Sequence, residues 1–170
     1  MGPAKLPPDE YYATLPHHIA GAGAIIHDAV DRILVVKPSY RNDTWEIPGG
    51  GLGAGEDPLH TARHEVKEEL GIDLAPGRLL VVVWVPEQPD GRPPLVNHFF
   101  DGGLMSQDEA ENRLHPDRDE LAQWRPATHA EWDTLLAPHM ARRLRSGSRV
   151  LAEGSTVYLK HGCDPTRPES

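Results

Sequence analysis

The chain of 170 residues has room for one domain with a sizeable core rather than for two. Its 17 lysines and arginines against 26 aspartates and glutamates give a formal net charge of −9, which argues against a broad surface for duplex nucleic acid, because such surfaces neutralise phosphates with cations. No apolar run approaches the roughly 20 residues of a membrane span, and the one cysteine, Cys163, excludes an intrachain disulfide, so we expect a cytoplasmic protein with no nucleic-acid or membrane partner.

Runs of apolar residues bounded by turn residues predict one domain at 17–150, between a flexible N-terminal tail at 1–16 and a partly disordered C-terminal extension at 151–170. Residues 49–55 hold five glycines, and we expect them to form a flexible loop. Residues 155–159 could form a strand, whose place in the fold the sequence leaves open. Strands are predicted, in chain order, at 18–26, 32–37, 45–48, 79–85, 95–100 and 121–125.

A helix with clear start and stop signals follows the glycine-rich segment. Asp57 can cap it, Pro58 suits its first position, and Gly71 suits its C-terminal exit. Further helices are predicted at 131–136 and 139–144. Helical spacing gives the first helix one apolar stripe, formed by Leu59, Ala62, Val66 and Leu70.

The same helix carries three carboxylates on one face. Glu65, Glu68 and Glu69 are related by steps of three and four residues, which bring them together on a helix. Like charges at this spacing repel one another, whereas a magnesium ion would be attracted to them, because hard cations prefer carboxylate and water oxygens. Glu56 adds a fourth carboxylate near the start of the helix. The alternative is a solvated acidic face without a ligand.

The residues around this face resemble a known family motif. Gly50, five residues, Glu56, seven residues and then 64–72 resemble the Nudix box, Gly-x5-Glu-x7-Arg-Glu-U-x-Glu-Glu-x-Gly-U, where U is a bulky aliphatic residue. All of its specified positions match over Gly50 to Ile72 except one, where His64 stands in place of the arginine. The chain is thus similar to the Nudix hydrolase (MutT-like) family.

The resemblance implies a fold and a reaction. The fold is an α/β/α sandwich with a mixed, curled β-sheet between helices. The reaction is Mg²⁺-dependent hydrolysis, with Mn²⁺ as a substitute, of a pyrophosphate bond in a small nucleoside-diphosphate-linked molecule, either a nucleoside-diphosphate sugar such as ADP-ribose or a nucleoside triphosphate. Members of the family often form homodimers, and we include a homodimer in the expectation.

The resemblance also assigns roles to residues. Glu65, Glu68 and Glu69 correspond to the carboxylate metal ligands, and one of them can double as general base. The carbonyl of Gly49 corresponds to a backbone ligand, and Glu56 supports the metal shell or binds a further ion. Some members take the base from a loop after the box, where Glu120 and Glu109 stand here, although both are better explained as surface acids.

His64 is the departure that puts activity in question. In the family, the arginine at this position pairs with a neighbouring glutamate and holds the catalytic face in place. Histidine offers two ring nitrogens instead of a fixed guanidinium fork, and Arg63 points about 100° away around the helix. Either His64 supports the glutamates as a donor, or the chain is a catalytically weak nucleotide-binding or regulatory module of the same fold.

Substrate contacts are predicted more loosely. Arg41 and Lys37 are candidate phosphate contacts, Trp45 is a candidate for stacking on a base, and His98 is a candidate lining residue of the cleft. Surface exposure or core packing explains each of them as well. An isomerase acting on allylic diphosphates is disfavoured, because related members that do this chemistry use a reactive cysteine and Cys163 is near the C-terminus.

Overall fold

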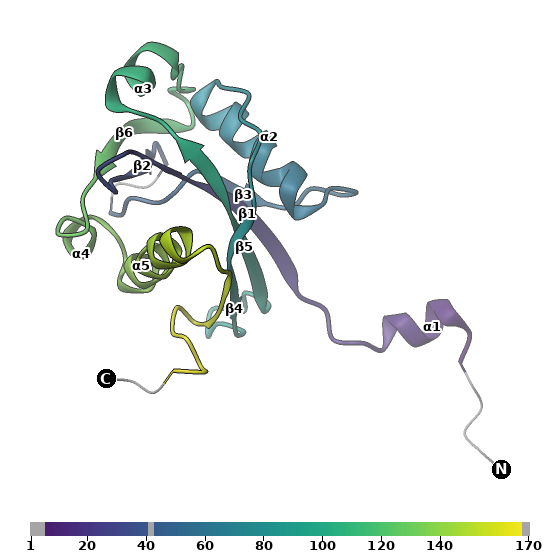
Figure 1. Cartoon of the computed structure of the whole chain (residues 1–170). Helices are drawn as coiled ribbons and strands as arrows, with labels where there is room; N and C mark the ends of the chain where they lie inside the picture. Colours follow the sequence, from purple (N-terminus) through teal and green to yellow (C-terminus); the bar gives the residue numbers. More distant parts are fainter. Residues whose placement is uncertain (1–5, 41–42, 168–170) are drawn as a thin grey trace.

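The computed structural model describes residues 6–40 and 43–167. Figure 1 shows a sheet with helices on both sides of it. The elements in chain order are α1 (Pro8–Ala13), β1 (Ile19–His27), β2 (Ile33–Pro38), β3 (Gly49–Gly51), α2 (Pro58–Leu70), β4 (Leu79–Val85), β5 (Leu95–Leu104), α3 (Gln107–Arg113), β6 (Leu121–Ala127), α4 (Trp132–Leu135), α5 (Pro138–Glu153) and β7 (Val157–Lys160).

The sheet is mixed and open. Its strands lie in the order β6-β2-β1-β5-β4-β7, and β3 pairs with β1 beside this path. The β1–β5 and β4–β7 pairs are parallel, whereas β1–β2, β1–β3, β2–β6 and β4–β5 are antiparallel. β1 and β5 are therefore the two middle strands, and β3, the strand that leads toward α2, is hydrogen-bonded directly to β1.

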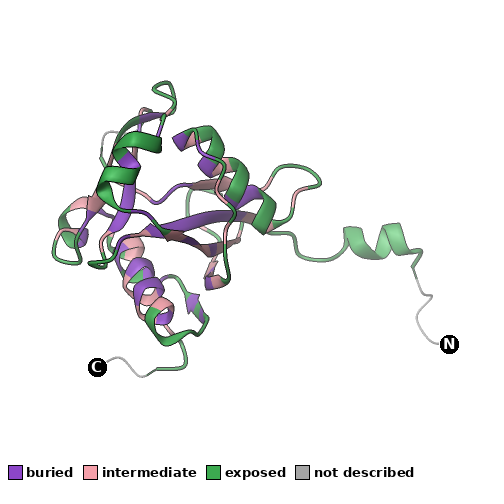
Figure 2. Cartoon of the chain, turned by 45° about the horizontal axis from the view of Figure 1, so that its top comes forward, coloured by how far each residue is buried: buried purple, intermediate pink, exposed green. Residues whose placement is uncertain are grey.

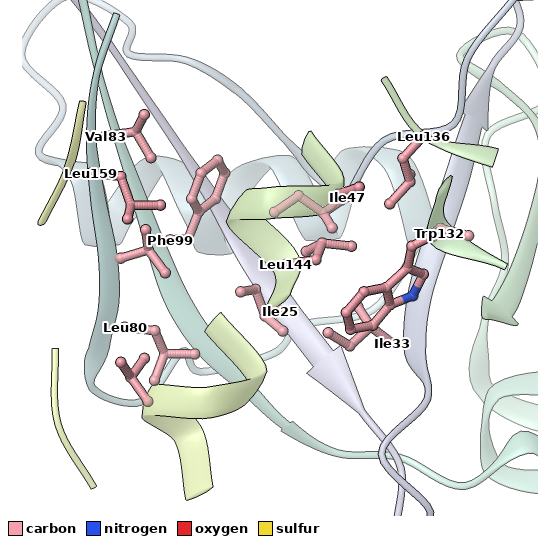
Figure 3. Close-up of a cluster of buried hydrophobic side chains, with 14 of the residues drawn as sticks. Ile25, Ile33, Ile47, Leu80, Val83, Phe99, Trp132, Leu136, Leu144 and Leu159 are labelled. Atoms are coloured by element: carbon pink, nitrogen blue, oxygen red, sulfur yellow. The ribbon is translucent and has the colours of Figure 1, made fainter. Parts of the chain in front are cut away.

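Adjacent side chains of β1 point to opposite faces of the sheet and enter two different cores. Ile25 belongs to the core under α4 and α5, which also contains Trp132 and Leu144; Figure 3 shows these side chains packed around one another. Ala24 and Ile26 belong to the core under α2 and α3. Figure 2 shows the buried residues concentrated in the strands and on the inner sides of the helices. The predicted mixed sheet between helices is confirmed.

The close pairing of β1 with β3 requires small residues. A Cβ on Gly23 would lie 2.6 Å from the carbonyl oxygen of Pro48, and a Cβ on Gly49 would lie 2.5 Å from that of Ala22. Both distances are shorter than real Cβ contacts, so alanine at either position would push the strands apart. The glycines predicted as a flexible loop thus include a short strand, and their absence of side chains lets it approach β1.

Three further segments differ from the prediction. Residues 45–48 form isolated bridges, Glu46 to Val36 and Trp45 to Leu136, rather than a strand. α3 was not predicted, although Ser106 and Glu109 form a capping box at its start. The segment 151–170, expected as a partly disordered extension in which 155–159 could form a strand of open position, contributes β7 to the sheet beside β4. In the tail, α1 has no buried residue.

No helix among the described residues is long and apolar enough to cross a membrane.

Candidate active site

The helix α2 that carries the three glutamates is fixed at both ends as predicted. The carboxylate of Asp57 accepts hydrogen bonds from the backbone N–H groups of Leu59 and His60 at 2.9 and 3.0 Å, and Pro58 occupies the first turn. Gly71 ends the helix in the left-handed conformation, with φ of 70°. On the inner side, Val66 and Leu70 are buried, so the helix cannot rotate without exposing them.

Glu69 is the glutamate most withdrawn from solvent. The backbone N–H of Gly49 donates a hydrogen bond to its Oε2 at 3.1 Å, which ties the end of α2 to β3. Burial raises the pKa of Glu69 to about 8, against the hydrogen bond from Gly49, and the negative charges of Glu65, Glu120 and Glu46 raise it further. Burial and the neighbouring carboxylates therefore disfavour the charged form of this carboxyl.

Glu65 lies one turn before Glu69 and meets the next residue of β3. A Cβ built on Gly50 would lie 2.4 Å from Oε1 of Glu65, so glycine at this position lets the carboxylate approach the backbone. Burial raises the pKa of Glu65, and the charge of Glu68 adds to the effect. Glu65 and Glu69 thus face β3 side by side, through Gly50 and Gly49.

Glu68 belongs to a second group, which is built around His64. Nε2 of His64 lies 2.9 Å from Oε1 of Glu68, and Nδ1 lies 3.1 Å from Oε1 of Glu56. Glu56 also accepts hydrogen bonds at Oε2 from the Thr61 hydroxyl and the N–H of Gly53. The charges of Glu68 and Glu56 raise the pKa of His64. His64 therefore links the helix to the loop that precedes it.

The donor set around Glu65 and Glu69 suits a divalent cation, although it does not form a closed cage. In the part of the chain that the structure describes, no group of three or more His, Cys, Asp or Glu side chains is placed to hold a metal ion. Magnesium needs no such group, because it usually keeps several waters and takes only one or two carboxylates. Two neighbouring carboxyls with raised pKa values, beside Gly49, provide these donors.

A cavity of about 270 Å³ opens beside β3. Gly49, Gly50 and Gly51 line it together with Glu46 and residues from β1, β5, α5 and the segment before β3. These further residues are Ile19, Ala20, Gly21, Ala22, Ile47, Leu95, Asn97, Phe99 and Met140. The cavity thus combines an apolar wall with a few polar groups, as small-molecule sites usually do. Gly49 and Gly50 line it and also contact Glu69 and Glu65, which do not line it themselves.

The predicted substrate residues lie apart from this cavity. Trp45 lines a different cavity beside β6, and Lys37 lies on β2, paired with Gln123. His98 neighbours Asn97 and Phe99 on β5, so its side chain points to the opposite face, where Nδ1 lies 3.2 Å from the carbonyl oxygen of Gly21. Arg41 is outside the described residues. None of the three described side chains lines the cavity at β3.

The two acids considered as alternative bases, Glu109 and Glu120, have different surroundings in the structure. Glu109 accepts a hydrogen bond from the N–H of Ser106 and caps α3. Glu120 is exposed, and its charge raises the pKa values of both Glu65 and Glu69. Glu46, which sequence reasoning missed, lines the cavity and also acts on Glu69. Its position just before the segment Pro48-Gly49-Gly50 could have indicated that it lies near the site.

Comparison with known proteins shows the family of the chain. The family model described as the NUDIX domain matches residues 17–148, which is most of the chain. The chain belongs to the NUDIX family. The family predicted from the box at 50–72 is thereby confirmed, and divalent metal ions are the usual cofactors in this family.

Individual relatives of this Nudix chain match over shorter stretches. Nucleoside diphosphate-linked moiety X motif 6 of Xenopus laevis is 45% identical over 72 residues, which are 42% of this chain and 31% of that protein. Diphosphoinositol polyphosphate phosphohydrolase 3-alpha of Homo sapiens is 40% identical over 62 residues, 36% of this chain and 38% of that protein. The chain thus spans only about a third of the curated relatives that it matches.

Solved structures agree on the fold. The crystal structure of a UDP-X diphosphatase superposes with a TM-score of 0.66 at 18% sequence identity, and covers 91% of this chain and 76% of that one. At this identity the likeness concerns the α/β Nudix fold alone.

Proposed function

We propose that the chain is a Mg²⁺-dependent pyrophosphohydrolase that cleaves the phosphate–phosphate bond of a small nucleoside-diphosphate-linked molecule. The observation that carries this proposal is the pair Glu65 and Glu69, which faces the backbone of Gly49 and Gly50 at the edge of a cavity. Membership of the NUDIX family supports it. The names of the curated relatives and of the similar solved structure all refer to a diphosphate, but not to one common nucleobase. The proposal therefore specifies the diphosphate and no particular nucleobase.

In this proposal, different residues bind the ion, orient a carboxylate and accept a proton. Glu65, Glu69 and the backbone of Gly49 would hold the ion, and Glu68 would complete the set. A bound Mg²⁺ neutralises phosphate charge and makes a water more acidic. The N–H of Gly49 orients the Glu69 carboxylate, and one of the glutamates of α2 accepts the proton of the attacking water. The apolar wall of the cavity receives the organic part of the substrate.

A substrate panel tests this function. The purified protein is incubated with nucleoside-diphosphate sugars, dinucleoside polyphosphates and nucleoside triphosphates, with Mg²⁺, with Mn²⁺ or with EDTA. We expect nucleoside monophosphate or pyrophosphate to be released from at least one class in either metal and from none in EDTA. Metal-independent cleavage, or no cleavage of any compound, would reject the proposal.

A nucleotide-binding module without turnover is the second candidate, because His64 replaces the arginine of the box. The contacts of His64 with Glu56 and Glu68 weigh against it, since they give this residue the supporting position of that arginine. The module would be favoured if ligands of the panel raised the melting temperature without being cleaved. The cytoplasmic location and the homodimer stay predictions.

A further inference from the structure

A buried arginine of α5 has no counter-charge among the residues that the structure describes. Arg143 is only 5% exposed. Its Nε is fully buried, and the described residues offer it no hydrogen-bond acceptor. Burial and the neighbouring charge of Arg142 lower its pKa to about 10, and no carboxylate opposes them. Arg143 is therefore charged at neutral pH, in a place where an unpaired charge is costly.

Arg143 lines a second cavity, of about 310 Å³, which is basic and rich in hydrogen-bond donors. Arg92, His139, His161 and the amides Gln88 and Asn97 also line it. None of the described lining residues is an aspartate or glutamate, although the chain as a whole carries a formal charge of −9. The guanidinium of Arg92 already pairs with Asp90, at 2.8 Å and at an exposed position. The uncompensated charge of this cavity is that of Arg143.

This second cavity adjoins the cavity at β3. Ile19, Leu95 and Asn97 line both of them. In Figure 1, α5 lies beside β4 and β5 on the side of the sheet away from α2. A molecule whose diphosphate lies at Gly49 and Gly50 can therefore extend past Asn97 toward Arg143.

We propose that the cavity at Arg143 is a subsite for a phosphate group that the substrate carries in addition to its scissile diphosphate. The inference rests on the proposed function. A phosphate has several oxygens that can accept bonds from a guanidinium and from ring and amide N–H groups together, and it supplies the charge that Arg143 lacks. The preferred substrate class is then a nucleoside-diphosphate-linked compound with a phosphate monoester on its distal part.

Binding of inorganic phosphate in EDTA is the first test, because it requires neither metal nor turnover. Arg143→Met removes the charge at similar volume, and Arg142→Met removes the same charge from the exposed neighbour on the same helix. We expect phosphate to raise the melting temperature of the wild type above that in KCl of equal ionic strength. Its affinity should fall at least about tenfold in Arg143→Met and stay within about twofold in Arg142→Met.

Equal phosphate affinity in wild type and Arg143→Met would overturn the proposal. So would the absence of any stabilisation of the wild type by roughly 50 mM phosphate, a measurement that does not depend on whether the variant folds. Arg143→Lys serves as a second variant, which keeps the charge and loses the planar fork; it should bind phosphate more tightly than Arg143→Met.

Paired ligands distinguish a substrate phosphate from free phosphate. Dissociation constants are measured in EDTA for a nucleoside-diphosphate compound with and without a phosphate monoester on its distal ribose. We expect the extra phosphate to tighten binding about tenfold in the wild type and to have little effect in Arg143→Met. If free phosphate binds but the extra phosphate gives no advantage, the substrate assignment is wrong. Hydrolysis of the compound without the extra phosphate tests the proposed function separately.

Discussion

His64 stands between two carboxylates that belong to different segments. Its ring reaches Glu56 in the loop before α2 and Glu68 one turn further along the helix. An arginine in this position would also supply donors to both sides, with a permanent charge. The charge of Glu68, and then that of Glu56, raises the pKa of His64 against the effect of burial. A raised pKa favours the charged imidazole, which resembles the permanently charged arginine more closely.

Replacement of His64 tests this supporting role. We expect His64→Ala to lower kcat/KM by about 10- to 100-fold, as the loss of a residue that orients metal ligands usually does. His64→Arg should retain activity within about threefold or raise it. The measurement is kcat/KM on the best compound of the panel, at saturating Mg²⁺.

Arg63→Ala is the matched control on the same helix. Arg63 pairs with Asp73 at an exposed position and touches neither Glu56 nor Glu68. Its removal should leave kcat/KM within about twofold. If Arg63→Ala lowered kcat/KM as much as His64→Ala does, the loss would reflect a general disturbance of α2 and not the contacts of His64 with Glu56 and Glu68.

The three glutamates could be predicted as a group from the sequence but could not be ranked by it. Helical spacing places Glu65, Glu68 and Glu69 on one face, whereas their different environments depend on β3, a strand that the glycine-rich sequence did not indicate. The substrate contacts were harder still. His98 and Asn97 are neighbours in sequence, and only the register of β5 decides which of them faces the cavity.

At the scale of elements, the sequence predicted those helix ends that depend on nearby residues. The cap at Asp57 and the exit at Gly71 gave both ends of α2. The Ser-x-x-Glu pattern at 106–109 is the corresponding local signal for the start of α3. β3 and β7 could not be read from the sequence with equal certainty, because each is a short strand that exists through pairing with a distant one.

The turn between β1 and β2 depends on one buried carboxylate. Asp28 is only 8% exposed, and its Oδ1 accepts hydrogen bonds from the N–H groups of Val30 and Arg32. Its Oδ2 accepts a further bond from the Arg32 guanidinium at 2.7 Å. Burial raises the pKa of Asp28, but the hydrogen bonds and the charge of Arg32 outweigh burial, and the pKa lies below the usual 3.8.

Asp28→Asn should therefore destabilise the fold in a pH-dependent way. We expect a loss of about 1–2 kcal/mol in the free energy of unfolding at neutral pH, from the charge-assisted bonds. A lowered pKa stabilises the fold above the unfolded value near 3.8, and this stability is lost as pH falls through the folded pKa. The difference between wild type and variant in urea unfolding should be complete above about pH 5 and shrink below pH 4.

Asp90→Asn provides the comparison for this prediction. Asp90 accepts similar bonds from Arg92 in the β4–β5 loop, but both side chains are more than half exposed. Solvent screens such a pair, so its loss should be clearly smaller than that of Asp28→Asn. Equal losses would show that burial does not set the strength of the Asp28 turn.

At the scale of the whole molecule, the C-terminal residues complete the sheet. β7 pairs in parallel with β4, and Leu159 is fully buried in the core under α5. Tyr158, its neighbour on the strand, is 50% exposed. Residues predicted as a partly disordered extension therefore contribute to the same core as the middle strand β1.

A pair of truncations measures this contribution. Leu159→Ala should lower the free energy of unfolding by about 2–5 kcal/mol, because it leaves a cavity in the core. Tyr158→Ala should cost less than about 1 kcal/mol, since its side chain is largely solvated. Urea denaturation of both variants beside the wild type provides the values. A negligible loss for Leu159→Ala would mean that β7 is peripheral to the fold.

The central claim is that carboxylates of α2 at the edge of β3 drive hydrolysis of a phosphate anhydride. Single-turnover cleavage of the best compound, with saturating Mg²⁺, tests it in wild type, Glu69→Gln and the exposed-surface control Glu111→Gln. We expect the rate to fall by at least about 100-fold in Glu69→Gln and to stay within about twofold in the control. Wild-type rates in Glu69→Gln, with product still dependent on Mg²⁺, would contradict the claim.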